Sequence, residues 1–357
     1  MNPSLMVETQ QEVSIRQAQA GPDAQLWEHF VSRNSHCNSA HRWNWKGVFE
    51  ESFGWRTFYL MAEEEGSIRG ILPLVWQKNW PLTAVLSSVP HLKGGGIVAE
   101  TPEIEARLLA EARRLAKELQ ASTLELRHNS SQAQAETART DKVAFVLPLL
   151  KDEKERLQAL DKKTRNMVKK SLSFGLTAEF NQERALDDFY EIFCCNMREL
   201  GSPVYARGFF QAIRRAFPES THICVVRHQG KAIAAAFLHG FRHSVEAIWA
   251  SSLSQYRALK PNMFMYWNLF RFAAERGYDE FDFGRSSVGS GTYNFKMQWS
   301  AKPVPLYWNY WLGQGSGVPQ VNGHSAKVRL VRWTWQRLPL SLTKVLGPQL
   351  IKFVPGV

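Results

Sequence analysis

Short apolar runs, a few of them alternating with polar residues, recur along both halves of the chain between clusters of turn residues. Such runs are typical of β-strands, and alternation with a period of two marks strands that place one face in a core. Pairs of such runs flank turns at residues 63–67 and 229–230, which predicts two β-hairpins. Strands are expected at residues 57–62, 68–76, 82–89, 123–127, 143–149, 177–180, 222–227, 232–241 and 244–251.

Other segments place apolar residues three and four positions apart, the spacing of a helix with one buried face. Residues 102–119 show it clearly, with Pro102 in the first turn. Residues 261–276 are apolar on nearly every side, so this helix is predicted to be buried. Residues 152–174 predict one long basic helix ending at Gly175. Its cluster of lysines and arginines fits either a solvated face or a docking surface for phosphates.

The two halves of the chain are similar to each other. Residues 66–71 resemble residues 230–235, and the helix–strand junctions before residues 127 and 285 also resemble each other, both at offsets of about 160 residues. A repeated offset favours duplication of one α/β unit, while chance recurrence of generic hairpins is the alternative. The predicted fold class is α/β (α+β), with mixed, mostly antiparallel sheets flanked by helices.

The segment at residues 281–299 carries the strongest candidate chemistry. It begins as a strand with alternating phenylalanines, and from Arg285 it is predicted to become a loop rich in serine and glycine. Lys296 follows, between the aromatic residues Tyr293, Phe295 and Trp299. A cation held beside such a loop suits a resident or developing negative charge. The alternative is a surface turn followed by a core segment with a solvated lysine.

The net charge of +11 is concentrated at the C-terminal end of the chain. No Asp or Glu follows Asp282, whereas nine lysines and arginines do. This end therefore suits anionic or phosphate-rich partners. Residues 328–354 alternate arginines with large apolar residues. The pattern fits an amphipathic element on an anionic membrane or a helix packed on the second half.

Cysteine and histidine spacings predict neither a disulfide framework nor a metal site, because the four cysteines form no CxxC and the ten histidines no HExxH. The N-terminal residues show no basic start followed by an apolar run, and no apolar run of about 18 residues occurs. A cytoplasmic location is expected, with peripheral contact at the inner membrane through the basic tail as a further expectation.

Several motifs resemble, in order, those of the FemAB aminoacyltransferases, and within them the branch associated with PEP-CTERM and exosortase exopolysaccharide loci. The motifs are SVP at 88–90 with GGG at 94–96, RNMVKKS at 165–171, MRELGSPVY at 197–205, FDFGRS at 281–286, GTYNFK at 291–296 and WQRLP at 335–339. The resemblance covers roughly residues 25–355. It implies two tandem acetyltransferase-like (GNAT) domains at residues 13–150 and 151–312, after a flexible leader at 1–12 and before a basic amphipathic tail at 313–357.

The resemblance also implies a reaction. It points to acyl or aminoacyl transfer to an amine or hydroxyl of a cell-envelope polysaccharide or peptidoglycan-type precursor, in exopolysaccharide biosynthesis or export. In that family the lysine corresponding to Lys296 neutralises the oxyanion of the transition state, so Lys296 is the expected catalytic residue. Substrate contacts are expected from Arg285, Ser286, Tyr293, Asn294, Tyr205, Gly95 and Gly96.

The expected partners follow from this reaction. The co-substrate would be acyl-CoA, an acyl carrier or aminoacyl-tRNA, with no permanently bound cofactor, and the acceptor an anionic glycan or lipid-linked precursor. The chain lacks the inserted coiled-coil arm of the peptidoglycan-modifying members, which weakens the case for aminoacyl-tRNA. Nucleic acid is expected as a partner only if tRNA is the donor. The alternative is a non-catalytic binding or scaffold component of a polysaccharide assembly complex.

Overall fold

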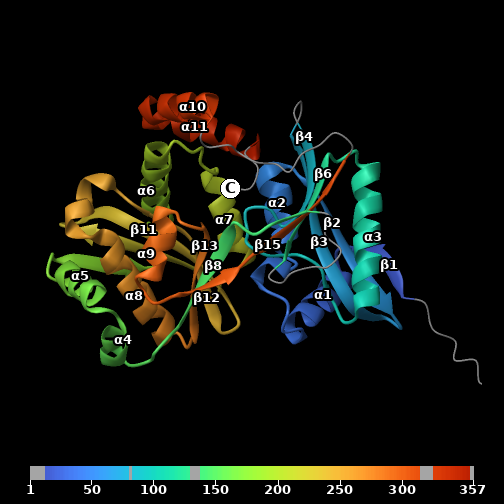
Figure 1. Ribbon diagram of the computed structural model, residues 1–357, viewed down its shortest axis with the longest axis horizontal. Helices are drawn as coiled ribbons and strands as arrows, with labels where there is room; N and C mark the ends of the chain where they lie inside the picture. The colour runs from blue at the N-terminus through green and yellow to red at the C-terminus, as the bar shows by residue number, and fades with distance from the viewer. Residues whose placement is uncertain (1–12, 80–82, 129–136, 314–324, 354–357) are drawn as a thin grey trace, which may run out of the picture.

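Two mixed β-sheets lie side by side in the computed structural model, which describes residues 13–79, 83–128, 137–313 and 325–353 (Figure 1). The first sheet has the order β1-β2-β3-β4-β6-β15-β7, with β5 beside β3. Its strands are β1 Ser14–Gln17, β2 Arg56–Glu64, β3 Ser67–Asn79, β4 Thr83–Ser88, β5 Val98–Ala99, β6 Thr123–His128, β7 Thr137–Arg139 and β15 Tyr307–Leu312.

The second sheet has the order β9-β10-β11-β12-β13-β8-β14. Its strands are β8 Lys142–Pro148, β9 Leu176–Phe180, β10 Thr221–His228, β11 Lys231–Phe241, β12 Ser244–Ser252, β13 Glu280–Ser287 and β14 Lys302–Pro305. Each sheet contains an antiparallel meander, β2-β3-β4 or β10-β11-β12, followed by a helix and a strand parallel to the last one. This shared topology confirms the predicted repeat of one α/β unit.

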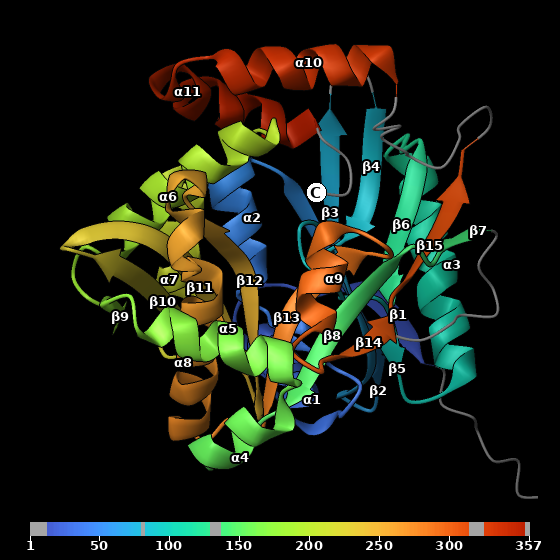
Figure 2. The same cartoon turned by 60° about the vertical axis from the view of Figure 1, so that its left-hand side comes forward.

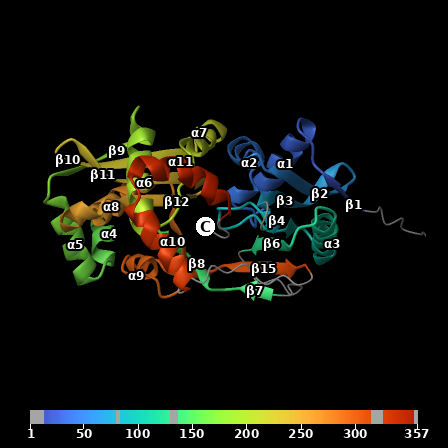
Figure 3. The same ribbon diagram turned by 90° about the horizontal axis from the view of Figure 1, so that it is seen from above.

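The two sheets exchange a strand (Figure 3). β8 follows the first half in sequence but pairs with β13 and β14 of the second sheet, whereas β15 follows the second half and pairs with β6 and β7 of the first. An apolar run predicts a strand without predicting its partner, because any open sheet edge offers the same backbone groups. The division at residues 150 and 312 therefore stays a proposal, and the leader at 1–12 lies outside the described residues.

Helices cover the faces of both sheets. The predicted helix at 102–119 is α3, and the predicted buried helix at 261–276 is α8, whose residues are mostly buried. The helices are α1 Pro22–Arg33, α2 Trp45–Phe53, α3 Pro102–Glu118, α4 Glu153–Ala159, α5 Lys162–Leu172, α6 Ala185–Leu200, α7 Arg207–Ala216, α8 Pro261–Glu275, α9 Gly291–Met297, α10 Ala326–Arg337 and α11 Leu340–Leu350, with short 3-10 turns at Ser39–His41, Ser254–Leu259 and Ile351–Phe353.

The prediction of a single helix over residues 152–174 is wrong. Leu160 has an extended backbone and separates α4 from α5. The carboxylate of Asp161 then caps α5 by accepting a hydrogen bond from Thr164 N at 2.9 Å. An aspartate here can cap a new helix, and this capping competes with extension of α4 through residues 160 and 161. The competition explains why one helix ends and another begins.

One hydrophobic core joins the two halves. It contains Trp45 and Phe49 of α2 in the first half, together with Phe209 and Phe210 of α7 and Phe237 of β11 in the second. The aromatic rings meet directly across the boundary, with Phe49 and Phe209 centroids 6.4 Å apart. Because such buried aromatic side chains each contribute on the order of 1.5–3 kcal/mol, the halves are held together as one packed body.

The C-terminal residues form a helical hairpin, α10 and α11, that lies across the end of α6 (Figure 2). Pro339 separates the two helices and occupies the position before the first residue of α11. Among the described residues, no helix is both long enough and apolar enough to cross a membrane.

Candidate active site between the divergent strands

The site lies where the parallel strands β12 and β13 separate. Their pairing is confined to Ser244–Glu246 with Glu280–Asp282. β13 then shifts its register and pairs with β8 through residues 285–287, so the predicted loop from Arg285 is instead a continuation of the strand. Gly284 sits at the shift with φ +68°, and a Cβ there would lie 3.2 Å from Ala247 O. Glycine is therefore required for this divergence.

A pocket of about 280 Å³ opens between the separated strands. β12 lines one side and β13 with α9 the other, while α6 and the segment after it close the third side. The first half contributes the loop that follows β4, through His91 and Lys93. The pocket is thus shared between the two halves of the chain.

Lys296 is the central group of this pocket. Its side chain is 6% exposed and comes from α9, whose start is fixed by Ser290 accepting a hydrogen bond from Tyr293 N at 3.1 Å. The Lys296 ammonium donates to Gly284 O at 2.9 Å and to Arg285 O at 3.0 Å. An ammonium has three N–H groups. Within the described parts of the chain, two of them donate to these carbonyl oxygens, so the third can donate to a bound ligand. Burial lowers the pKa of Lys296 to about 7, an effect that the nearby Glu246 carboxylate opposes.

The aromatic residues around Lys296 differ from those predicted. The Lys296 ammonium lies over the ring of Phe145 on β8, with Nζ 5.8 Å from the ring centroid. Tyr293 packs against the same ring at 5.0 Å, and Trp299 is fully buried against Phe270. The sequence neighbours therefore anchor α9 in the core, while the exchanged strand supplies the ring beside the cation.

Arg285 extends the positive charge toward the first half. Its guanidinium donates to Leu92 O at 3.3 Å and lies 5.6 Å from the ring centroid of Trp308 on β15. Arg127 of the first sheet lies over the same ring at 4.3 Å. Burial lowers the pKa of Arg285 to about 10, and the neighbouring Arg127 acts in the same direction. Arg285 nevertheless remains cationic at neutral pH.

Lys93 links the halves through an ion-pair cluster. Its ammonium lies 3.2 Å from Glu246 Oε2 on β12 and also pairs with the Asp282 carboxylate on β13. Asp282 is buried and accepts a hydrogen bond from Gly284 N at 2.8 Å, so it fixes the divergence of the strands. Glu246 lines the pocket and faces Lys296. Glu246 therefore presents a carboxylate, paired with Lys93, to the interior of the pocket.

The structure brings together three of the predicted site residues. Lys296, Arg285 and Tyr205 all line the pocket, and the Tyr205 hydroxyl lies 3.1 Å from His91 Nδ1. The buried Ser286, the half-buried Tyr293 and the exposed Asn294 do not line it.

Gly95 and Gly96 also lie away from this pocket. A Cβ on Gly95 would meet Val89 at 2.8 Å. Gly96 lines a separate pocket of about 460 Å³ in the first half, with His41 and His128. Burial lowers the pKa of both histidines to about 4, which keeps them neutral. His41 Nε2 bonds to Gly96 O and His128 Nε2 accepts from Ile97 N, so these rings hold the loop after β4 in place.

Sequence reasoning missed several pocket residues. Lys93 lies in a glycine-rich loop whose contacts with the second half have no local sequence signal. Thr292, Trp249 and the hydrogen-bonded pair Asn196–Ser251 at 3.1 Å were missed as well. A register shift in the pairing of β11 with β12 interrupts the period of two along β12, so alternation alone does not identify which of its residues line the pocket. Within the described parts of the chain, no cluster of three or more His, Cys, Asp or Glu side chains could hold a metal ion.

Comparison with known proteins identifies the fold. A family model described as an acetyltransferase (GNAT) domain matches residues 155–297. The solved structure of FemX is similar with a TM-score of 0.66 at 14% identity, over 83% of this chain and 96% of that one. A tandem GNAT protein from the clavulanic acid biosynthesis pathway has a TM-score of 0.55 at 12% identity, over 86% and 100%. The fold is a tandem GNAT fold.

The similarity to these solved structures extends over both halves of the chain, because it covers 83% and 86% of its length. L-PGS from Bacillus licheniformis shares the fold with a TM-score of 0.53 at 13% identity, over 90% of this chain and 99% of that one. No curated protein matches the chain. The fold predicted from the sequence resemblance is confirmed, and the family model places its match on the GNAT unit that contains Lys296.

Proposed function

We propose that the chain is an acyltransferase whose reaction takes place in the pocket between β12 and β13. The observation that carries the proposal is the Lys296 ammonium, buried at the divergence and bonded to Gly284 O and Arg285 O. A preorganised donor in a water-poor site stabilises charge that develops on a carbonyl oxygen, and such a donor commonly lowers the barrier by about 3–4 kcal/mol.

The proposed step begins with attack of an acceptor amine or hydroxyl on the acyl carbon of the donor. The carbonyl oxygen becomes an anion and is neutralised by Lys296, while the acceptor gives its proton to Glu246. Collapse of the tetrahedral intermediate breaks the bond to the leaving group, a thiolate or an alkoxide, which takes the proton. Arg285 adds positive potential for an anionic donor or acceptor. No bound cofactor takes part, because the acyl donor is a co-substrate.

The proposed acceptor is a cell-envelope precursor, of polysaccharide or peptidoglycan type, within exopolysaccharide biosynthesis. The support is the motif resemblance to the FemAB branch associated with PEP-CTERM and exosortase loci, which includes the GTYNFK segment that supplies Lys296. Acyl-CoA, acyl-carrier and aminoacyl-tRNA donors all fit an acyl-transfer reaction.

The test is a screen of donors by thermal shift followed by transfer assays. A donor that binds the native state raises the melting temperature in proportion to RT ln(1 + [L]/Kd). We expect one donor class to stabilise the protein, and Lys296→Ala to retain that shift while losing transfer to a hydroxylamine or amine acceptor. Binding of a donor with no turnover in the unaltered protein would instead favour the scaffold alternative.

A further inference from the structure

The C-terminal hairpin, defined here as residues 325–353, is attached to the second half through one face. Trp335 of α10 is buried, and Gln336 Nε2 donates to Glu199 O at the end of α6 at 2.8 Å. Lys344 of α11 pairs with Glu191 of α6. Gly347 lies so close to Val204 that a Cβ would approach Val204 N to 2.8 Å. The hairpin is therefore fixed on α6 and is not a loose tail.

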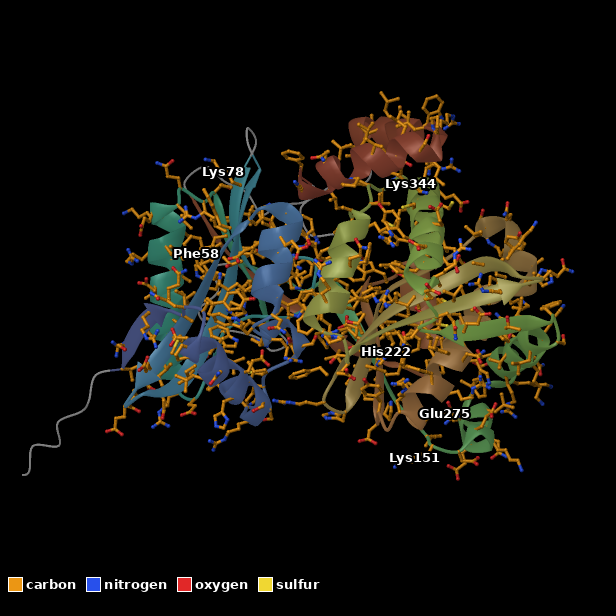
Figure 4. The ribbon with its side chains drawn as sticks, turned by 180° about the vertical axis from the view of Figure 1, so that it is seen from behind. Phe58, Lys78, Lys151, His222, Glu275 and Lys344 are labelled. Carbon is orange, nitrogen blue, oxygen red and sulfur yellow. The ribbon has the colours of Figure 1, made fainter. Side chains whose placement is uncertain are left out.

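The part of the hairpin surface that is not packed on α6 carries many exposed apolar side chains. Eight of the fifteen exposed large hydrophobic side chains among the described residues belong to it. Val331 of α10 is 67% exposed and Val345 of α11 is 68% exposed. Figure 4 shows the side chains of α10 and α11 standing away from the body of the molecule. The other six are Leu330, Trp333, Leu342, Leu346, Leu350 and Phe353. A concentrated apolar surface of this kind marks an interaction site.

Cations accompany this apolar face. Arg329 is exposed on α10, and the Arg337 guanidinium stacks over the Trp333 ring at 3.8 Å. No Asp or Glu side chain follows Asp282. Lys78 on β3 lies at the same end of the molecule as Lys344, whereas Lys151 lies at the opposite end (Figure 4). A second copy docked on this face would oppose cation to cation, whereas an anionic bilayer complements it.

We propose that the hairpin docks on an anionic lipid bilayer, with its apolar side chains in the interface and its cations against the headgroups. Tryptophan, branched aliphatic residues and arginine are the composition that such interfacial helices use. The exposed face lies on a packed hairpin, so binding orders no new structure.

The docking orients the pocket between β12 and β13. Leu200, which lines that pocket, directly precedes Gly201, against which the Arg332 side chain packs. The pocket rim thus adjoins the hairpin, and a docked protein holds it at the bilayer surface. If the pocket carries out the proposed acyl transfer, this geometry assigns a membrane-anchored molecule as the acceptor. That molecule would reach the pocket along the bilayer surface, beside α6.

Vesicle sedimentation tests the docking. The full-length protein is mixed with phosphatidylcholine vesicles, with or without about a third of phosphatidylglycerol. We expect binding to the anionic vesicles, weakened by salt, and at least about a tenfold loss of the partition coefficient in Val331→Asp/Val345→Asp. The matched control is Leu172→Asp, which alters an exposed leucine on the basic helix α5. It should bind like the unaltered protein.

Three outcomes overturn the proposal. Equal binding to neutral vesicles removes the role of the anionic headgroups, and equal loss in Leu172→Asp removes the role of the hairpin. A dimer that Val331→Asp/Val345→Asp converts to a monomer, without vesicle binding, assigns the face to a second copy. Lys296→Ala should bind vesicles normally while losing transfer, so failure of the docking and failure of the acyl transfer are distinguishable.

The position of the pocket rim is tested separately by fluorescence. Cys195→Ser removes the one described cysteine that is not fully buried, and Leu200→Cys then carries a fluorophore. We expect quenching by doxyl-labelled anionic vesicles at position 200 and none when the label is moved to Leu172→Cys. Equal quenching at both positions, or none at position 200, contradicts the proposed orientation.

Discussion

The two sheets place different groups at the same point of one topology. In the first sheet, β4 pairs with β6 up to Ser87 and Glu125, and in the second sheet β12 pairs with β13 up to Glu246 and Asp282. Both pairings end on a buried carboxylate, Glu125 or Asp282. The repeated unit therefore retains an acidic position where its parallel strands begin to separate.

The partners of the two carboxylates differ. Glu125 pairs with Arg127 at 2.7 Å on its own strand, whereas Asp282 pairs with Lys93 from the other half. In register, Arg127 corresponds to Gly284. The first sheet fills this position with a side chain, and the second leaves it to a glycine whose carbonyl receives Lys296. The separation of the two parallel strands is thus a property of the fold, present in both sheets. The candidate site requires three further features, which are Gly284, the short helix α9 and the loop of the first half that carries Lys93.

The largest expected effect comes from removing the cation that joins the halves. Lys93→Ala leaves Glu246 and Asp282 without their partner, and breaking a buried pair in this way costs about 3–5 kcal/mol. Urea denaturation of Lys93→Ala measures the loss. The control is Arg114→Ala, which breaks exposed pairs with Glu111 and Glu118 and should change stability by less than about 0.5 kcal/mol.

Arg127→Met sharpens the comparison, because it removes the ion-pair partner of Glu125 in the first sheet, as Lys93→Ala removes that of Asp282 in the second. Both variants should lose stability, but donor binding should weaken only in Lys93→Ala, whose side chain lines the pocket. Equal loss of donor binding in both variants would show that the second sheet has no special role.

The next effect concerns the rate. Lys296→Ala should lower the transfer rate by about 100- to 1,000-fold, as expected for loss of one oxyanion donor. Lys302→Ala, an exposed lysine on β14, provides the control and should leave the rate unchanged. Circular dichroism and thermal melting establish that both variants are folded. A fully active Lys296→Ala protein would remove this residue from the mechanism.

Gly284→Ala tests the backbone geometry at the point where β12 and β13 separate. The positive φ and the 3.2 Å approach to Ala247 O predict a destabilisation of about 1–3 kcal/mol. Gly230→Ala is a suitable control, since Gly230 has φ +78° with no atom within 4 Å of a Cβ. Its cost reports the φ penalty alone, and the excess in Gly284→Ala, measured by urea denaturation, reports the close approach. No excess would mean that the strands adjust freely.

Much of the fold was predictable because its signals are local. The short apolar runs of β10 and β11 and the apolar surface of α8 required only neighbouring residues, and Gly66 and Gly230 occupy equivalent turns. The exchange of β8 and β15 was not predictable in this way. Their pairing depends on which sheet edge lies near, and that depends on the fold of the whole chain.

The candidate site divides along the same line. Lys296 and Arg285 were found because they share one segment with a recognisable pattern. Lys93 was not, since its two carboxylate partners lie more than 150 residues away in sequence. Phe145 was missed for the same reason. Contacts between residues of the two halves have no signal in the local sequence, because they depend on how the whole chain folds.

The smallest effect is a pH dependence that separates the role of Lys296 in catalysis from its role in stability. With a pKa of about 7, the fraction of ammonium falls about tenfold for each pH unit above that value. The transfer rate should fall with it between about pH 7 and 9, whereas Lys296→Arg, if active, should lose this dependence because a guanidinium stays charged.

Stability should move in the opposite direction. The folded-state pKa of Lys296 lies below its usual value of 10.5, so between about pH 7 and 10.5 the unfolded chain binds more protons than the native protein. The free energy of unfolding therefore rises with pH over this window. The rise is measured as the difference between the unaltered protein and Lys296→Met, which cancels all other titrating groups. If this difference in the free energy of unfolding does not change with pH, Lys296 is not desolvated in the folded protein. The second sheet would then lack the buried cation at Gly284 that distinguishes it from the first sheet.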